Sequence, residues 1–287
     1  MATPEVSGFF DEATNAITYV VADAATSRCV VIDPVLDYDA AAGRTSTESV
    51  DQVIKFIQDN QLHTDLVLET HVHADHLTAA PVLKDRLRSK VAIGANVTAV
   101  QDVFSTLFNL GDIATDGSQF DRLLVDGDEF DVGEIRGRVI HTPGHTPSCS
   151  TYVIGDAAFV GDTLFMPDFG TARCDFPGGD AETLYESIQR IFELANDTRL
   201  FICHDYKAPG RDEYAWETTV AEQRDKNIHI HDGITKQEFV AFRKERDTQL
   251  GMPKLLLPSI QVNIQAGNMP TPEANGVSYL KVPINAL

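Results

Sequence analysis

Five of the nine histidines stand where an apolar run has just ended or inside a turn that contains glycine and proline. Three of these five crowd into residues 71–76, HVHADH, shortly after the apolar run at residues 66–68. Imidazole and carboxylate groups together bind divalent first-row metal ions. The segment therefore predicts a metal centre built on His71, His73, Asp75 and His76.

Three further positions offer side chains that could complete this centre. His145 lies in the stiff turn at residues 142–146, TPGHT, and Asp162 follows an apolar run in residues 160–163, VGDT. His204 follows the run at residues 200–202 in the same way. Strand ends converge on one rim of a sheet, so separated segments can supply ligands to one ion. The remaining histidines are interpreted as surface residues or hydrogen-bonded core residues: His63, His141, His229 and His231.

The elements that must position these side chains alternate between strands and helices. Short runs rich in β-branched residues predict strands at residues 17–21, 29–32, 66–68, 136–140, 150–154, 157–160 and 200–202. Apolar residues at helical spacing predict helices around residues 50–57, 100–108 and 184–192, and Thr45 with Glu48 matches a capping box before the first helix. Beyond residue 217 the chain is expected to be helical and then punctuated by prolines. This alternation indicates a layered α and β architecture.

The charge of the chain restricts its partners. Its 43 acidic and 23 basic side chains give a formal net charge of −20, which opposes the phosphate attraction on which nucleic-acid binding depends. Nucleic acid is therefore not an expected partner, and an anionic small substrate would need a local basic patch. The 287 residues, 43% of them hydrophobic, provide enough apolar surface for one large core.

A cytoplasmic location is expected. The N-terminal residues lack a basic region followed by a long apolar run, so neither a secretory signal nor a membrane-spanning helix is expected. The four cysteines are scattered without a C-x-x-C pair, which favours reduced thiols over a disulfide framework: Cys29, Cys149, Cys174 and Cys203.

The order and spacing of the metal-binding motifs resemble the metallo-β-lactamase superfamily across residues 10–210. The resemblance implies an α+β fold, an αββα sandwich of two mixed β-sheets flanked by helices, with the metal at one edge of the sheets. It implies a single domain over residues 1–287, in which residues 211–287 form a helical and extended C-terminal region. Superfamily relatives are often dimers, so a homodimer is expected, and the apolar residues 255–257 are a candidate for its interface.

Three further segments are similar to the persulfide dioxygenase branch, the family of the ethylmalonic encephalopathy protein: residues 170–176 (GTARCDF), residues 203–206 (CHDY) and a C-terminal stretch from residue 257 to residue 287. The similarity implies one Fe²⁺ per chain, held by His71, His145 and Asp162, a facial triad that leaves three coordination positions open. It also implies that glutathione persulfide reacts with dioxygen and water to give sulfite and glutathione. Four other residues would then orient the iron ligands, although in hydrolase relatives their counterparts bind metal directly: His73, Asp75, His76 and His204.

A tripeptide substrate with two carboxylates requires cationic contacts. Arg173 is the first candidate for such a contact, followed by Arg224 and Lys207, and the alternative for each is a solvated surface charge. Tyr206 is a candidate catalytic residue that could hydrogen-bond the substrate sulfur or a bound oxygen, and its alternative is an ordinary core tyrosine. Cys174 stands where the branch often has threonine and is interpreted as a small, buried residue.

Two other functions remain open on the sequence. A dinuclear zinc thiolester hydrolase of the glyoxalase II kind would arrange two ions and a bridging hydroxide among seven side chains: His71, His73, Asp75, His76, His145, Asp162 and His204. A non-enzymatic module that senses persulfide or metal would instead use Cys174 or Cys149 as its responsive thiol. Metal content separates the two enzymes, and a substitution of His145 would silence an enzyme but not a cysteine-based sensor.

Overall fold

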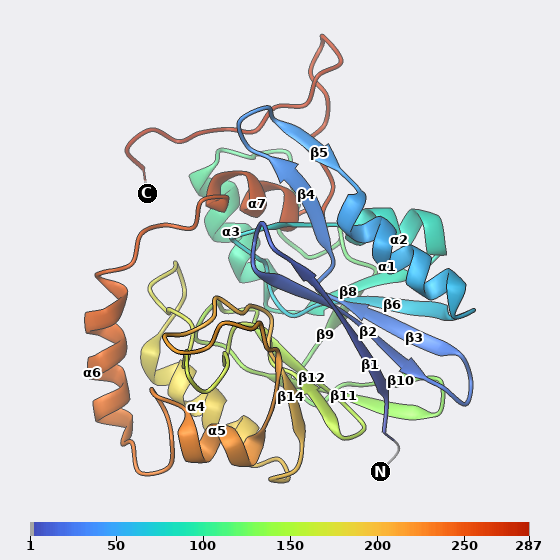
Figure 1. Cartoon of the computed structure of the whole chain (residues 1–287). Helices are drawn as coiled ribbons and strands as arrows, with labels where there is room; N and C mark the ends of the chain where they lie inside the picture. The colour runs from blue at the N-terminus through green and yellow to red at the C-terminus, as the bar shows by residue number, and fades with distance from the viewer. Residues whose placement is uncertain (1–2, 287) are drawn as a thin grey trace.

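Two six-stranded β-sheets form the centre of the computed structural model, which describes residues 3–286 (Figure 1). The first sheet has the strand order β1-β2-β3-β6-β8-β9. Strands β1 to β3 pair antiparallel, whereas β3, β6, β8 and β9 run parallel, so the sheet is mixed. The bounds of its strands are β1 (Glu5–Asp11), β2 (Ala16–Asp23), β3 (Arg28–Ile32), β6 (His63–Glu69), β8 (Lys90–Gly94) and β9 (Arg122–Leu124).

The second sheet has the order β10-β11-β12-β13-β14-β15 and is antiparallel except for the β13–β14 pair. Its strands are β10 (Glu129–Val132), β11 (Ile135–His141), β12 (Ser150–Ile154), β13 (Ala157–Phe159), β14 (Arg199–Phe201) and β15 (Glu217–Thr219). A small third sheet joins β4 (Val35–Asp39), β5 (Arg44–Ser46) and β7 (Leu77–Thr78). Side chains from the facing surfaces of the two large sheets form one buried core, which includes Ile32, Leu68, Tyr152 and Phe159.

Helices cover the outer faces of this sandwich (Figure 1). The first sheet packs against α1 (Glu48–Asp59), α2 (Ala80–Leu87), α3 (Val97–Leu107) and α7 (Leu256–Asn263). The second sheet packs against α4 (Ala181–Phe192), α5 (Val220–Lys226) and α6 (Lys236–Asp247). The αββα sandwich expected from the sequence is therefore confirmed, and none of the helices in residues 3–286 is both long and apolar enough to cross a membrane.

Helix α1 shows where local sequence rules succeed and where they fail. Its buried face consists of the residues expected from their helical spacing: Val50, Val53, Ile54 and Ile57. The expected capping box is wrong, because Thr45 belongs to β5 and the helix begins at Glu48, after Thr47. Thr45 pairs with Tyr38 in the small sheet, so strand pairing overrides the local capping signal.

Helix α7 was not expected from the sequence. Pro258 lies in its first turn, where the backbone nitrogen of a residue has no partner within the helix, so the proline is tolerated. The suggestion that residues 255–257 form a subunit interface is wrong for Leu256, which is buried in the chain's own core together with Ile260 and Ile264. The residues after the helix run along the outside of the molecule to the C-terminus (Figure 1).

Candidate metal centre

The ends of several strands meet at one edge of the sandwich and deliver the candidate ligands. Strand β6 ends at Glu69 and leads into residues 71–76, hereafter the metal loop. His145 lies in the turn between β11 and β12, and Asp162 and His204 each follow the last residue of their strand by three positions. The turn that carries His145 needs glycine, because Gly144 has φ +135° and a Cβ there would lie 2.4 Å from the Cα atom of Leu184 in α4.

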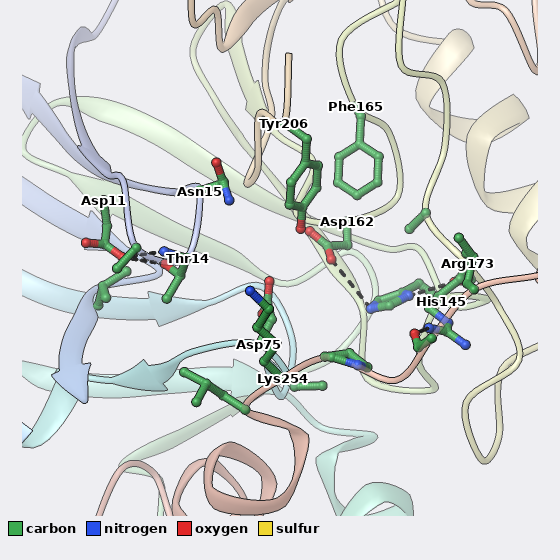
Figure 2. A pocket seen from close by; sticks show the side chains of 18 of the residues that line it. Asp11, Thr14, Asn15, Asp75, His145, Asp162, Phe165, Arg173, Tyr206 and Lys254 are labelled. Atoms are coloured by element: carbon green, nitrogen blue, oxygen red, sulfur yellow. Dashed lines mark hydrogen bonds and ion pairs between the residues drawn. The ribbon is translucent and has the colours of Figure 1, made fainter. Parts of the chain in front are cut away.

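The first donor set consists of His71, His145 and Asp162. The Asp162 Oδ2 atom lies 3.9 Å from His71 Nε2 and 3.6 Å from His145 Nε2. One donor atom from each of the three residues falls within 4.8 Å of the others, close enough for a single ion to join them. All three residues line a cavity that opens to the surface, and Figure 2 shows His145 and Asp162 turned toward one another inside it. A ligand in the cavity can therefore reach an ion held by this set.

Hydrogen bonds fix the two imidazoles of this set in the orientation that a metal requires. The Thr70 hydroxyl donates to Asp33 Oδ2 (2.8 Å), so it accepts its contact with His71 Nδ1 (3.0 Å) from a protonated nitrogen. His145 Nδ1 lies 2.7 Å from the Arg173 carbonyl oxygen and donates to it. Because each Nδ1 atom is engaged in a hydrogen bond, the Nε2 atom of each ring faces Asp162 and is the nitrogen that can bind a metal ion. Burial, with the adjacent His73 ring, holds the pKa of His71 well below its usual value, which keeps this imidazole neutral.

A second donor set lies beside the first and is more deeply buried. It consists of His73, His76, His204 and Cys203, and the His204 Nε2 atom also lies 3.2 Å from Asp75 Oδ2 and 3.5 Å from Asp162 Oδ1. Within the described residues, five nitrogen atoms of this set are buried without a hydrogen-bond partner other than an acidic neighbour: His73 Nδ1 and Nε2, His76 Nε2, and His204 Nδ1 and Nε2. Unpartnered buried polar atoms are costly, so the arrangement also fits a metal ion.

His73 has a second environment on its other side. Its Nε2 atom lies 3.0 Å from Asp33 Oδ1 and 3.6 Å from Glu69 Oε2, and all three side chains are buried. Burial, reinforced by the Asp33 charge, raises the pKa of Glu69 to about 8. The ring is therefore anchored by two acidic residues at the base of the metal loop, away from the cavity.

Tyr206 stands over the centre on the loop that follows β14. Its ring is nearly parallel to that of His204, with centroids 5.8 Å apart, and packs against Phe165 and Phe169. Figure 2 shows its hydroxyl directed toward Asp162. Although 41% of Tyr206 is exposed, desolvation around its hydroxyl, with the nearby Asp75 and Asp162 charges, holds the pKa of Tyr206 above its usual value, so the hydroxyl is available as a donor.

The cavity in front of the first donor set has a volume of about 1040 Å³. Its wall combines aromatic rings with positively charged side chains: Phe165, Phe169, Phe176, Arg44, Arg173, Arg246 and Lys254. Carboxylates also contribute, among them Asp11, Asp37 and Asp39. A cavity of this size holds a molecule as large as a tripeptide.

Of the cationic residues expected to bind substrate, only Arg173 lies at the cavity. It is already engaged, because it forms a bidentate pair with Asp175 (2.6 and 2.7 Å) and donates to the Gly251 carbonyl oxygen. Arg224 pairs with Asp232 at 3.1 Å, and the Lys207 ammonium lies 4.3 Å from the centre of the Tyr214 ring. Among residues 3–286, neither Arg224 nor Lys207 lines the cavity, so the structure does not bring them to the site.

The sequence interpretation missed three cavity residues from the C-terminal region. Arg246 lies on the last turn of α6, and Lys254 lies on the segment between α6 and α7. Both line the cavity, and neither forms an ion pair with a carboxylate of residues 3–286. His229 was interpreted as a surface residue or a hydrogen-bonded core residue, and its Nδ1 atom does accept a hydrogen bond from the Thr171 backbone (3.0 Å), but it also lines the cavity. No local motif marks these residues, because the fold alone brings them to the cavity.

Comparison with known proteins agrees with this geometry. A family model of the metallo-beta-lactamase superfamily matches residues 14–204, which include every residue of both donor sets. The chain belongs to this superfamily. The crystal structure of ETHE1 from Myxococcus xanthus superposes with a TM-score of 0.74 at 31% identity, over 92% of this superfamily member and 100% of that chain.

Relatives of this superfamily member carry different functional names. A probable metallo-hydrolase of Burkholderia pseudomallei is 54% identical over 98% of this chain and 99% of its own, and glyoxylase B2 of Dictyostelium discoideum is 51% identical over 93% and 92%. The human mitochondrial persulfide dioxygenase ETHE1 is 30% identical over 92% of this chain and 89% of its own. The comparisons thus establish a metal-binding enzyme superfamily and include both hydrolase and dioxygenase names.

Proposed function

We propose that this protein is an iron-dependent persulfide dioxygenase that oxidises glutathione persulfide to sulfite. The observation that carries the proposal is the division of the donor residues. His71, His145 and Asp162 line the open cavity, whereas His73 is anchored by Asp33 and Glu69 behind the metal loop. Two histidines and one carboxylate on an open face are the ligand set typical of non-haem Fe²⁺ oxygenases.

Such a centre leaves room for two reactants. His71, His145 and Asp162 would hold Fe²⁺, and the bound ion would supply electron transfer between the persulfide sulfur and dioxygen. The reaction breaks the S–S bond of glutathione persulfide, and the terminal sulfur gains two oxygen atoms from dioxygen and one from water. The products are sulfite, glutathione and two protons.

The protein side chains have separate roles in this proposal. The Tyr206 hydroxyl, which faces Asp162, donates a hydrogen bond to the substrate sulfur or to oxygen. Phe165, Phe169 and Phe176 form an apolar wall that limits water around the reacting sulfur. Two hydrogen bonds orient the proposed histidine ligands. The Arg173 carbonyl oxygen accepts one from His145, and the Thr70 hydroxyl accepts one from His71.

Two cationic side chains suit the rest of a glutathione substrate. Arg246 and Lys254 line the cavity, and neither is paired with a carboxylate of the described residues. Glutathione carries two carboxylates, which charge-assisted hydrogen bonds to arginine and lysine can hold. In a protein of net charge −20 these two cations provide a local site for an anion.

Oxygen uptake tests the proposal. Protein loaded with Fe²⁺ under anaerobic conditions and then mixed with glutathione persulfide in aerated buffer should consume one dioxygen for each sulfite formed. His145→Ala, prepared in the same way, should show no uptake above that of free iron. An iron-loaded protein that consumes no oxygen would refute the assignment.

A dinuclear zinc hydrolase of glutathione thiolesters is the second candidate, and one observation favours it. Asp162 directs one carboxylate oxygen toward each donor set, and the unpartnered nitrogens of His76 and His204 could hold a second ion. The metallo-hydrolase and glyoxylase names of two relatives point the same way. Hydrolysis of a hydroxyacylglutathione by protein that contains two zinc ions per chain would establish this alternative.

A sensor based on Cys149 or Cys174 has less support. Both thiols are buried, and burial raises the pKa of each to about 12. A thiol that remains protonated reacts slowly with persulfides and oxidants, because the thiolate is the nucleophile.

A further inference from the structure

The C-terminal helix reaches the metal loop through one buried side chain. Asn263 is the last residue of α7 and is only 4% exposed. Its Nδ2 atom donates to the carbonyl oxygens of His73 (2.9 Å) and His76 (2.8 Å). Its Oδ1 atom accepts from the backbone nitrogen of Thr78 (2.9 Å), just beyond the loop. One amide therefore joins three backbone groups across a sequence separation of up to 190 residues.

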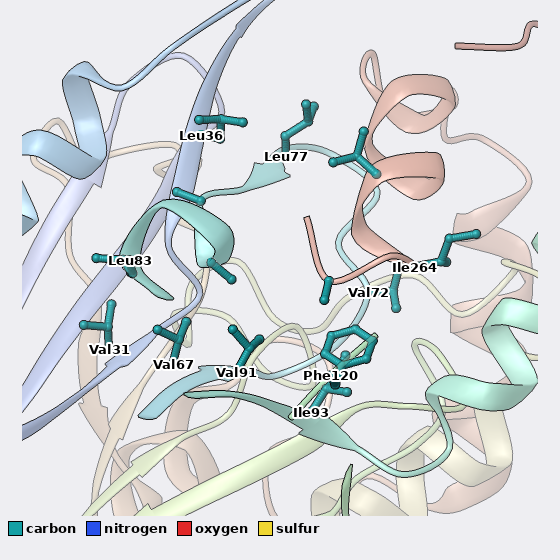
Figure 3. Close-up of a cluster of buried hydrophobic side chains, with 14 of the residues drawn as sticks. Val31, Leu36, Val67, Val72, Leu77, Leu83, Val91, Ile93, Phe120 and Ile264 are labelled. Atoms are coloured by element: carbon teal, nitrogen blue, oxygen red, sulfur yellow. The ribbon is translucent and has the colours of Figure 1, made fainter. Parts of the chain in front are cut away.

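These bonds matter because the metal loop is irregular and buried. Backbone carbonyl groups inside a protein need hydrogen-bond donors, and a loop lacks the repeated pairing that a helix or strand provides. The Asn263 amide supplies donors to two carbonyl groups of the loop, and it does so from a helix that is itself fixed. In the same buried cluster, Val72 of the loop packs with Ile264 directly after α7 (Figure 3).

We propose that Asn263 is a positioning residue that holds the metal loop in its metal-binding conformation before an ion arrives. The donor atoms of His71, His73 and His76 depend on the backbone of this loop, and hydrogen bonds at two of its carbonyl groups restrict that backbone. A loop ordered in advance loses less conformational entropy when it binds an ion. The proposal rests on the metal centre of the proposed function but not on the choice between oxygenase and hydrolase.

Gln261 provides a matched control on the same helix. It is also a buried amide with three hydrogen bonds, but it joins α7 to the C-terminal segment and not to the metal loop. Its Nε2 atom donates to the carbonyl oxygens of Leu257 (2.7 Å) and Lys281 (2.8 Å), and its Oε1 atom accepts from the Lys281 backbone (2.8 Å). Replacing Gln261 therefore removes a comparable set of bonds without affecting the loop directly.

Cobalt binding to metal-free protein tests the proposal without an activity assay. The variants are Asn263→Asp, which keeps the shape and the acceptor but loses both donors, Asn263→Ala, and the control Gln261→Ala. Each metal-free variant is titrated with Co²⁺ at a temperature well below its melting temperature. The visible absorption of bound Co²⁺ then gives the Kd. We expect the Asn263 variants to raise this Kd by about 10- to 100-fold, and Gln261→Ala to change it less than about 3-fold.

The melting temperature separates positioning from general stability. All three variants are expected to melt earlier than the natural protein, because each loses buried hydrogen bonds. Equal Co²⁺ affinities for Asn263→Asp and Gln261→Ala would overturn the proposal. If neither Asn263 variant folds, hydrogen exchange in the metal-free natural protein decides. The Thr78 amide and residues 260–263 should already exchange slowly without Co²⁺, and rapid exchange there that slows only when Co²⁺ is added would overturn the proposal. Failure of the dioxygenase assignment would alter neither result.

Discussion

Asp162 stands between His145 and His204 and turns a different carboxylate oxygen toward each. Its Oδ2 atom lies 3.6 Å from His145 Nε2, and its Oδ1 atom lies 3.5 Å from His204 Nε2. The same side chain therefore borders the donor set that faces the cavity and the set buried behind it. The number of ions in the centre can therefore be tested by asking which histidines are required for metal binding.

Substitution of His204 is expected to spare the iron, whereas substitution of His145 is expected to remove it. His145 belongs to the proposed iron ligands, but His204 contacts Asp162 from the other side. His204→Ala should retain close to the natural iron content and lose about 10- to 100-fold in kcat, because Asp162 is less well oriented. Elemental analysis of the two variants provides the check. Equal iron loss from both would contradict a mononuclear centre.

Arg246 and Lys254 are expected to determine affinity for the substrate and not the chemical step. Arg246→Ala and Lys254→Ala should each raise the KM for glutathione persulfide by about 3- to 10-fold with little change in kcat, because each removes one charge-assisted contact. The control is Arg224→Ala, since Arg224 pairs with Asp232 and does not line the described cavity. A KM that responds equally to all three substitutions would indicate a general charge effect and contradict a specific site.

Tyr206→Phe is expected to lower kcat by about 10- to 100-fold at nearly constant KM. The ring would still pack against Phe165 and Phe169, so the melting temperature should stay close to that of the natural protein. Because the pKa of Tyr206 is held well above its usual value, its hydroxyl should show no titration in the activity profile between pH 6 and 9. Unchanged kcat in the variant would remove Tyr206 from the mechanism.

The cysteines are expected to resist alkylation in the folded protein. All four are buried, and burial raises the pKa of Cys149 and of Cys174 to about 12. At pH 8 the thiolate form of such a group is about one part in 10⁴, and it increases about tenfold with each pH unit. Mass spectrometry after treatment with iodoacetamide should find negligible labelling until the protein is unfolded. Rapid labelling of either thiol at pH 8 would revive the sensor alternative.

The sequence could single out the residues that the structure brings together in the candidate metal centre, because each has a local signal. His71 and its neighbours follow an apolar strand, and His145 lies in a turn whose glycine has the positive φ that the TPGHT pattern suggests. The α1 helix face was predictable for the same reason. In each case the residues that form the sequence pattern lie within a few positions of the residue whose structure they predict.

The cationic residues of the cavity wall and the hydrogen bonds from Asn263 to the metal loop could not be predicted in this way. Arg246 on α6 and Lys254 on the segment between α6 and α7 line the cavity, although both are far in sequence from the metal loop. Asn263 contacts a carbonyl oxygen 190 residues away, and nothing near it in the sequence distinguishes it from Gln261. The prediction for Arg224 and Lys207 rests on their charge, and the tertiary structure places both side chains away from the cavity.

Metal content per chain in freshly purified protein, measured together with its oxidation state, tests the central claim most directly. We expect about one iron per chain, ferrous under reducing conditions, and its loss when His71 and Asp162 are both replaced by alanine. Two zinc ions per chain with no bound iron would contradict the dioxygenase account. Full oxygen uptake retained by the double variant would contradict the location of the metal itself.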